Sequence, residues 1–109
     1  MKEPTLDELN LLHANICQAL GDPKRILILY ALHKQARHVT ALADDLGLPQ
    51  PTVSRHLRVL RQRALVSKER VGTAVVYRLT DARMIDVLNE MRQVMRDALA
   101  RQSEVLNLA

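Results

Sequence analysis

The sequence of 109 residues is poor in aromatic side chains and in glycine. It contains two tyrosines and neither phenylalanine nor tryptophan. Proteins that bind single-stranded nucleic acid usually stack bases on aromatic rings, so this composition disfavours that class. The three glycines are too few for most phosphate-binding glycine loops, and no nucleophile–base pair is apparent. We therefore do not expect an enzyme.

Cysteine and long hydrophobic runs are scarce as well. The single cysteine, Cys17, excludes a disulfide within one chain and fits a reducing compartment. No apolar run approaches the roughly 18 residues of a membrane span, and the first residues do not resemble a signal peptide. We expect a cytoplasmic protein without a membrane partner. At this length we expect one domain, residues 1–109, whose modest core would gain from burial on dimerisation.

Positive charge is present and is concentrated in one third of the chain. The net charge is +4 overall. Residues 49–80 contain seven basic side chains against Glu69 alone, or +6, so the remainder carries −2. A patch of this kind favours a polyanionic partner.

A two-faced helix over residues 49–65 lies at the start of this basic region. Pro49 and Pro51 suit only the first turn of a helix, so they mark its beginning. Arg55 and Arg58 fall on the side opposite an apolar stripe. The stripe recurs at helical spacing and consists of Val53, Leu57, Leu60 and Ala64. Such a helix can be anchored along one side while it reads a DNA groove with the other.

Caps, turns and periodicity predict a mainly α chain with a small β-hairpin. A capping box over residues 5–8 starts a first helix that ends near residue 21, and Asp22-Pro23 starts a second. Residues 35–38 are expected to be a connection. A short helix over residues 39–46, stopped by Gly47, precedes the helix over 49–65, which is a helix-turn-helix arrangement. Residues 66–80 alternate about a Gly72-Thr73 turn as a hairpin, and Asp81 caps a last helix.

The first and last helices are apolar over more of their surface than one small core can cover. This predicts a homodimer built from both ends of the chain. The expected interface residues are Leu9, Leu12, Ile16, Ile85, Leu88, Met91, Met95 and Leu99.

Three segments resemble ArsR/SmtB-type transcriptional regulators, and together they span nearly the whole chain. They are LGDPKRILIL (residues 20–29), LGLPQPTVSRHLRVL (46–60) and ALVSKERVGTAVVYRL (64–79). The resemblance implies a winged helix-turn-helix of order α-α-α-α-β-β-α, dimeric through its terminal helices. It also implies a repressor that leaves an inverted-repeat, double-stranded operator when an inducer binds. A winged-helix protein-interaction module and a DNA binder without an inducer are the alternatives.

The same resemblance assigns the residues that would meet DNA. In the recognition helix these are Gln50, Thr52, Ser54, Arg55 and His56, and in the wing they are Arg70 and Thr73. Phosphates are expected to be held by Arg58, Arg61, Arg63 and Lys68.

The sequence contains none of the familiar residue patterns that would identify the inducer of such a regulator. Thiolate sites in the family commonly place Cys-x-Cys on the helix before the recognition helix, where residues 39–42 contain no cysteine. Zinc sites on the last helix need histidine, and none follows His56. We therefore expect no metal-dependent sensing and no cofactor. His13 and Cys17, four residues apart, are the remaining metal candidates; Cys17 could instead be a redox thiol or simply pack at the interface.

Overall fold

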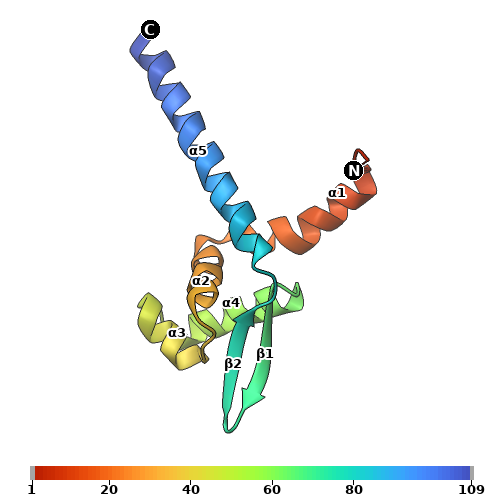
Figure 1. Cartoon of the computed structure of the whole chain (residues 1–109), viewed down its shortest axis with the longest axis vertical. Helices are drawn as coiled ribbons and strands as arrows, with labels where there is room; N and C mark the ends of the chain where they lie inside the picture. The colour runs from red at the N-terminus through yellow and green to blue at the C-terminus, as the bar shows by residue number, and fades with distance from the viewer. Residues whose placement is uncertain (1, 109) are drawn as a thin grey trace.

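The computed structural model describes residues 2–108 and confirms a mainly helical chain with one antiparallel hairpin (Figure 1). A π-helical segment, η1 (His13–Cys17), and a 3₁₀ turn, η2 (Ala19–Gly21), connect the first two α-helices. The α-helices are α1 (Leu6–Leu12), α2 (Pro23–Lys34), α3 (Val39–Leu46), α4 (Gln50–Gln62) and α5 (Arg83–Leu108), and the strands are β1 (Val66–Val71) and β2 (Ala74–Leu79). This is the order of a winged helix-turn-helix. No helix within residues 2–108 is long and apolar enough to cross a membrane.

The N-terminal helical segment begins as predicted and then changes its winding. Thr5 caps α1, because its hydroxyl accepts the backbone N–H of Glu8 at 3.2 Å. After Leu12 the α-helical pattern gives way to η1 and then to η2. At that transition the side-chain amide of Asn15 donates to the carbonyl of Leu11 at 2.8 Å, which offers this carbonyl an alternative to an α-helical amide.

The core lies where α4 packs against α2. Three members of the predicted stripe, Val53, Leu57 and Leu60, are completely or almost completely buried together with Ile28 and Leu29 of α2. The fourth, Ala64, was predicted wrongly. It is exposed and has a φ of 59°, because α4 has already ended and the chain turns there into β1.

The turn between α3 and α4 depends on one glycine. Gly47 has a φ of 65°, and the N–H groups of Gly47 and Leu48 bond back to the carbonyls of Asp44 and Ala43 at 3.3 and 3.1 Å. This closes α3 in the way predicted, with a left-handed residue just past the last helical position. The chain then enters α4 at Pro49 within two residues, so the angle between α3 and α4 is set locally.

The hairpin is held by a segment that the sequence suggested was only a connection. Val71 pairs with Ala74 across a turn in which Gly72 has a φ of 64°. Arg37, in the segment 35–38, forms an isolated antiparallel bridge to Tyr77 through two backbone hydrogen bonds of 3.1 and 2.8 Å. The predicted connection is confirmed, and residue 37 in addition attaches this loop before α3 to the outer edge of β2.

The terminal helices project from this body on the side away from the hairpin tip (Figure 1). The radius of gyration is 17.0 Å, whereas a compact chain of this length has about 13 Å. Exposed apolar residues on these helices include Leu6, Leu9, Leu11 and Leu12 in α1 and Val87, Met91, Val94, Met95 and Leu99 in α5. Patches of this kind on a small chain indicate a surface that another molecule covers.

Two residues of the expected interface belong to the core instead. Ile85 and Leu88 are only 4% and 2% exposed, and both lie in the buried cluster of their own chain. They anchor the first turns of α5 to the body, so their assignment to a dimer interface is corrected. The sequence could not separate these two positions from their neighbours, because both sets fall on a broadly apolar helix.

We expect Gly47→Ala to lower the free energy of unfolding by about 1–2 kcal/mol, because a Cβ is unfavourable at positive φ. Gly21→Ala is the matched control, since that residue does not have positive φ and has open space around the added carbon. It should change the stability by less than about 0.5 kcal/mol. Denaturant unfolding followed by circular dichroism measures both variants. Equal losses would contradict the assigned role of Gly47.

Candidate nucleic-acid interface

One side of α4 is fixed by the core, and the other side is left to solvent. Since Val53, Leu57 and Leu60 are buried, the opposite side of the helix turns outward. The exposed side chains on this helix include Gln50, Ser54, Arg55, Arg58 and Arg61. All five are among the residues that the sequence assigned to DNA contact.

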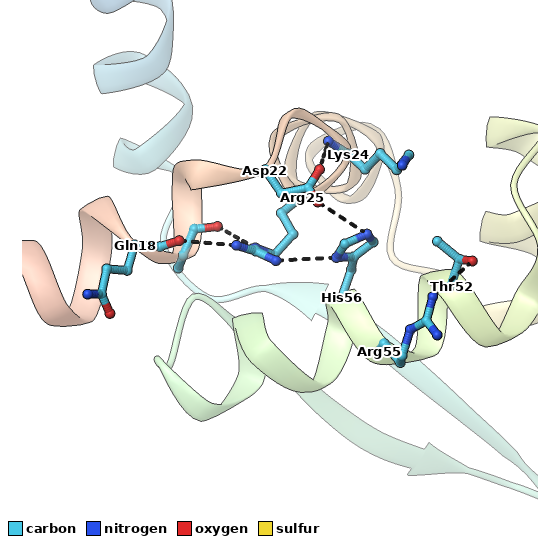
Figure 2. A network of polar contacts seen from close by, with 8 residues as sticks. Gln18, Asp22, Lys24, Arg25, Thr52, Arg55 and His56 are labelled. Atoms are coloured by element: carbon cyan, nitrogen blue, oxygen red, sulfur yellow. Dashed lines mark hydrogen bonds and ion pairs between the residues drawn. The ribbon is translucent and has the colours of Figure 1, made fainter.

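The N-terminal turn of α4 has the features of a surface for anions and base edges. It contains no acidic residue, and no side chain caps its backbone N–H groups. Arg55 donates a long hydrogen bond of 3.5 Å from Nη2 to the hydroxyl of Thr52 (Figure 2). A guanidinium has five N–H donors, so Arg55 keeps most of them for a base or a phosphate.

The positive surface continues past the end of α4 into the hairpin. Its exposed members there are Arg63, Lys68, Arg70 and Thr73. Arg78 differs from these, because its Nε lies 2.6 Å from Oε1 of Glu69 on the paired strand. This ion pair neutralises the only acidic residue of the region and leaves the other side chains with one sign of charge.

His56 lies elsewhere than the sequence suggested. Its side chain is only 13% exposed and is directed toward the start of α2 rather than along the outer face (Figure 2). Its Nδ1 is 3.4 Å from Nη1 of Arg25, and its Nε2 is 3.8 Å from Oδ2 of Asp22. This placement argues against a contact between His56 and a base. Sequence reasoning missed the arrangement because Arg25 is 31 residues away in the chain.

The surroundings of His56 select one protonation state. Burial lowers the pKa of His56, with Arg25, Lys24 and Arg55 acting in the same direction, and the carboxylate of Asp22 opposes them. A guanidinium can only donate, so Nδ1 accepts from Arg25 and the ring proton sits on Nε2, facing Asp22. The pKa of Asp22 is itself lowered, chiefly by the backbone N–H of Lys24, which its carboxylate accepts as the cap of α2.

The candidate sensing residues do not form a site within one chain. His13 and Cys17 both lie in η1 and both are exposed. In the part of the chain that the structure describes, no three histidine, cysteine, aspartate or glutamate side chains gather into a group that could hold a metal ion.

Known proteins resemble this chain in both sequence and structure. The sequence profile of a family described as "Bacterial regulatory protein, arsR family" matches residues 22–68. The HTH-type transcriptional regulator NmtR of Mycobacterium tuberculosis is 42% identical over 77 residues, which are 71% of this chain and 64% of NmtR. The HTH-type transcriptional repressor SmtB of the same organism is 37% identical over 89 residues, which are 82% of this chain and 61% of SmtB. The chain thus spans less than two thirds of the length of these two relatives.

A solved structure shows the same fold. It is the solution structure of the homodimeric winged helix-turn-helix DNA-binding domain Mb0332 from Mycobacterium bovis, described as a possible ArsR-family transcriptional regulator. It superposes with a TM-score of 0.73 at 28% sequence identity, and the match covers 91% of this chain and 94% of that one.

Proposed function

Since this chain belongs to the arsR family of bacterial regulatory proteins, we propose that it represses transcription by binding double-stranded DNA as a homodimer. The observation that carries this proposal is the outer face of α4, where Ser54, Arg55 and Arg58 are exposed while the opposite face is locked in the core. A repressor of chromosomal genes acts in the cytoplasm, and its chemistry is binding rather than catalysis.

In the proposed complex α4 enters the major groove from its N-terminal end. Gln50, Ser54 and Arg55 meet base edges there, and a guanidinium can bind guanine through two parallel hydrogen bonds. Thr52 is half-buried beside Arg55 and orients its guanidinium. Phosphates on either side are held by Arg58, Arg61, Arg63 and Lys68, and the wing contributes Arg70 and Thr73.

A second copy supplies the other half of the site. The exposed apolar faces of α1 and α5 are the surfaces on which we place the homodimer contact. The proposed contact residues are Leu9, Leu12, Ile16, Met91, Met95 and Leu99, to which the structure adds the exposed Val87 and Val94. A two-fold axis through this contact would set two α4 helices about 34 Å apart, which suits an inverted-repeat operator.

A winged-helix module that binds another protein is the second candidate function. The outer face of α4 disfavours it, because protein interfaces bury apolar anchors at their centre and this face presents arginines and polar groups. The family also makes DNA the expected partner.

DNA binding by the unlabelled protein can be tested without knowledge of the operator sequence. Duplexes are selected from a random pool with the purified protein, and binding of the selected duplex is followed by fluorescence anisotropy at several salt concentrations. If the dimer neutralises roughly six to eight phosphates, log K should fall against log salt with a slope of about −5 to −7. A failure to enrich any duplex, with no salt-dependent binding, would overturn the proposed function.

Two single-arginine variants separate base reading from phosphate binding within that experiment. Arg55→Ala should cost about 1–3 kcal/mol on the selected duplex and relax the base preference at one position in each half-site. Arg58→Ala, the matched control, should weaken selected and scrambled duplexes alike and reduce the salt slope by about one for each chain. If Arg55→Ala instead weakens both duplexes equally, Arg55 holds a phosphate only.

The proposed homodimer predicts the effect of a charge on α5. Met91 is 54% exposed, and Met91→Glu should convert the dimer to a folded monomer and reduce operator affinity by at least about 100-fold, because a buried carboxylate opposes association. Gln93→Glu places the same charge on the opposite side of α5 and should leave the dimer intact. Analytical ultracentrifugation measures both. A Met91→Glu variant that remains dimeric would rule out this interface.

The inducer is proposed to act without a resident metal. The zinc and thiolate sites known in the family oppose this proposal. In its favour, no third ligating side chain joins the exposed His13 and Cys17 in a group within the described residues. Equilibrium dialysis of the dimer against Zn²⁺ and Ni²⁺, with His13→Ala and Cys17→Ser as comparisons, should show less than one tightly bound ion for each dimer. Stoichiometric binding that either substitution removes would establish a metal site instead.

A further inference from the structure

Arg25, in the first turn of α2, joins two parts of the chain that the proposed function uses separately. Its Nε donates to the carbonyl of Ala19 at 2.6 Å, and its Nη2 donates to the carbonyl of Gln18 at 3.1 Å. Its Nη1 lies 3.4 Å from Nδ1 of His56 in α4. Figure 2 shows the guanidinium between the two backbone carbonyls on one side and the imidazole on the other.

The two carbonyls belong to the end of the N-terminal helical segment. Gln18 follows η1 and Ala19 starts η2, so these are among the last carbonyls of the helix that carries the exposed leucines of α1. The carbonyl of Gln18 also accepts the N–H of Gly21 at 3.1 Å, and carbonyls at the end of a helix bear partial negative charge, which a guanidinium complements. Arg25 therefore fixes the direction in which the N-terminal segment leaves the body.

The imidazole belongs to the helix that is proposed to read DNA. His56 lies on the flank of α4, between the buried stripe and the exposed arginines, with its side chain packed toward α2. Its bond to Arg25 limits rotation of α4 about its own axis, which the apolar stripe alone restrains only along one side. One guanidinium thus contacts both the N-terminal segment and the reading helix.

We propose that Arg25 is a positioning residue for DNA binding, which couples the orientation of α4 to the N-terminal segment through His56. The inference rests on the proposed function, because the benefit lies in presenting two α4 helices at a fixed mutual angle. In a dimer joined through α1 and α5, this bridge relates each reading helix to the symmetry axis. Arg25 does this without touching DNA.

The bridge exists in one protonation state of His56, which gives the proposal a specific signature. The charged groups around this imidazole are Asp22, Lys24 and Arg25 at the start of α2 and Arg55 on its own helix. The neutral ring accepts from Arg25 at Nδ1. When the pH falls through the lowered pKa of His56, Nδ1 takes a proton, the bond to Arg25 is lost, and the imidazolium is drawn toward Asp22 and repelled by Arg25. The bridge is thus complete above this pKa and opens below it.

The test uses the full-length dimer and the selected duplex. Arg25→Met removes the charge and all donors but keeps an apolar stem, and Lys24→Met removes a neighbouring positive charge that makes no contact with the bridge. Arg25→Met should weaken operator binding about tenfold at neutral pH, because α4 must then be ordered during binding. Lys24→Met should change it less than about twofold. Circular dichroism and ultracentrifugation confirm fold and dimer in both.

The pH profile separates positioning from simple support of the fold. His56→Asn keeps an acceptor near the position of Nδ1 but does not titrate. When the pH is lowered from about 7.5 past the ordinary histidine pKa of about 6.5 to the lowest pH at which both dimers stay folded, the affinity of the unsubstituted dimer should fall severalfold relative to His56→Asn. This difference should vanish when both carry Arg25→Met. If Arg25→Met does not fold, the pH profiles of affinity of the unsubstituted dimer and His56→Asn still show whether the bridge affects DNA binding.

The outcomes distinguish this inference from the function on which it rests. An unsubstituted dimer that binds no duplex overturns the proposed function itself. If the unsubstituted dimer binds DNA, two results would overturn the bridge alone. One is an equal affinity of Arg25→Met and Lys24→Met for the selected duplex. The other is that the unsubstituted dimer and His56→Asn have parallel pH profiles of affinity. A tenfold loss together with the His56-dependent profile supports it.

Discussion

The burial of one side of α4 against α2 is the interaction on which the rest of the molecule depends. Val53, Leu57 and Leu60 contribute apolar area that is completely removed from water, and each buried aliphatic side chain of this size stabilises the fold by about 1.5–3 kcal/mol. The same contact decides which side chains of α4 face outward. A basic helix without that anchor would have no defined reading face, so stability and proposed function share one set of residues.

The flank of α4 has a different chemistry from its two faces. His56 is neither in the core nor on the outer face, and it meets Arg25 and Asp22 where α2 begins. Asp22 also caps α2, and Arg25 also satisfies the carbonyls at the end of the preceding segment. The start of α2 is thus a junction of three helical segments, built within the short run Gly21–Arg25. The motif that identified the family is thus also the place where these segments meet.

Most features governed by neighbours in sequence could be predicted, although the end of α4 before Ala64 was missed, and features governed by distant partners could not. Gly47, the Asp22-Pro23 start and the Gly72 turn each act over four or five residues, so local rules were sufficient. The Arg37–Tyr77 bridge and the contact between Arg25 and His56 join residues far apart in the chain, which no periodicity encodes. The prediction that Ile85 and Leu88 lie at the dimer interface was wrong for a related reason. When a helix is apolar on several sides, its sequence does not show which side packs against the core of its own chain.

The bridge at Arg37 also protects the hairpin from unwanted pairing. A two-stranded sheet has two edges, and an open edge is a template for strands of other chains. Arg37 occupies part of the β2 edge, while β1 carries the charged run Lys68, Glu69 and Arg70, which discourages strand addition. The proposed self-association is thereby left to the apolar terminal helices. A hairpin that must stay uncovered in order to reach a partner remains resistant to edge-to-edge aggregation.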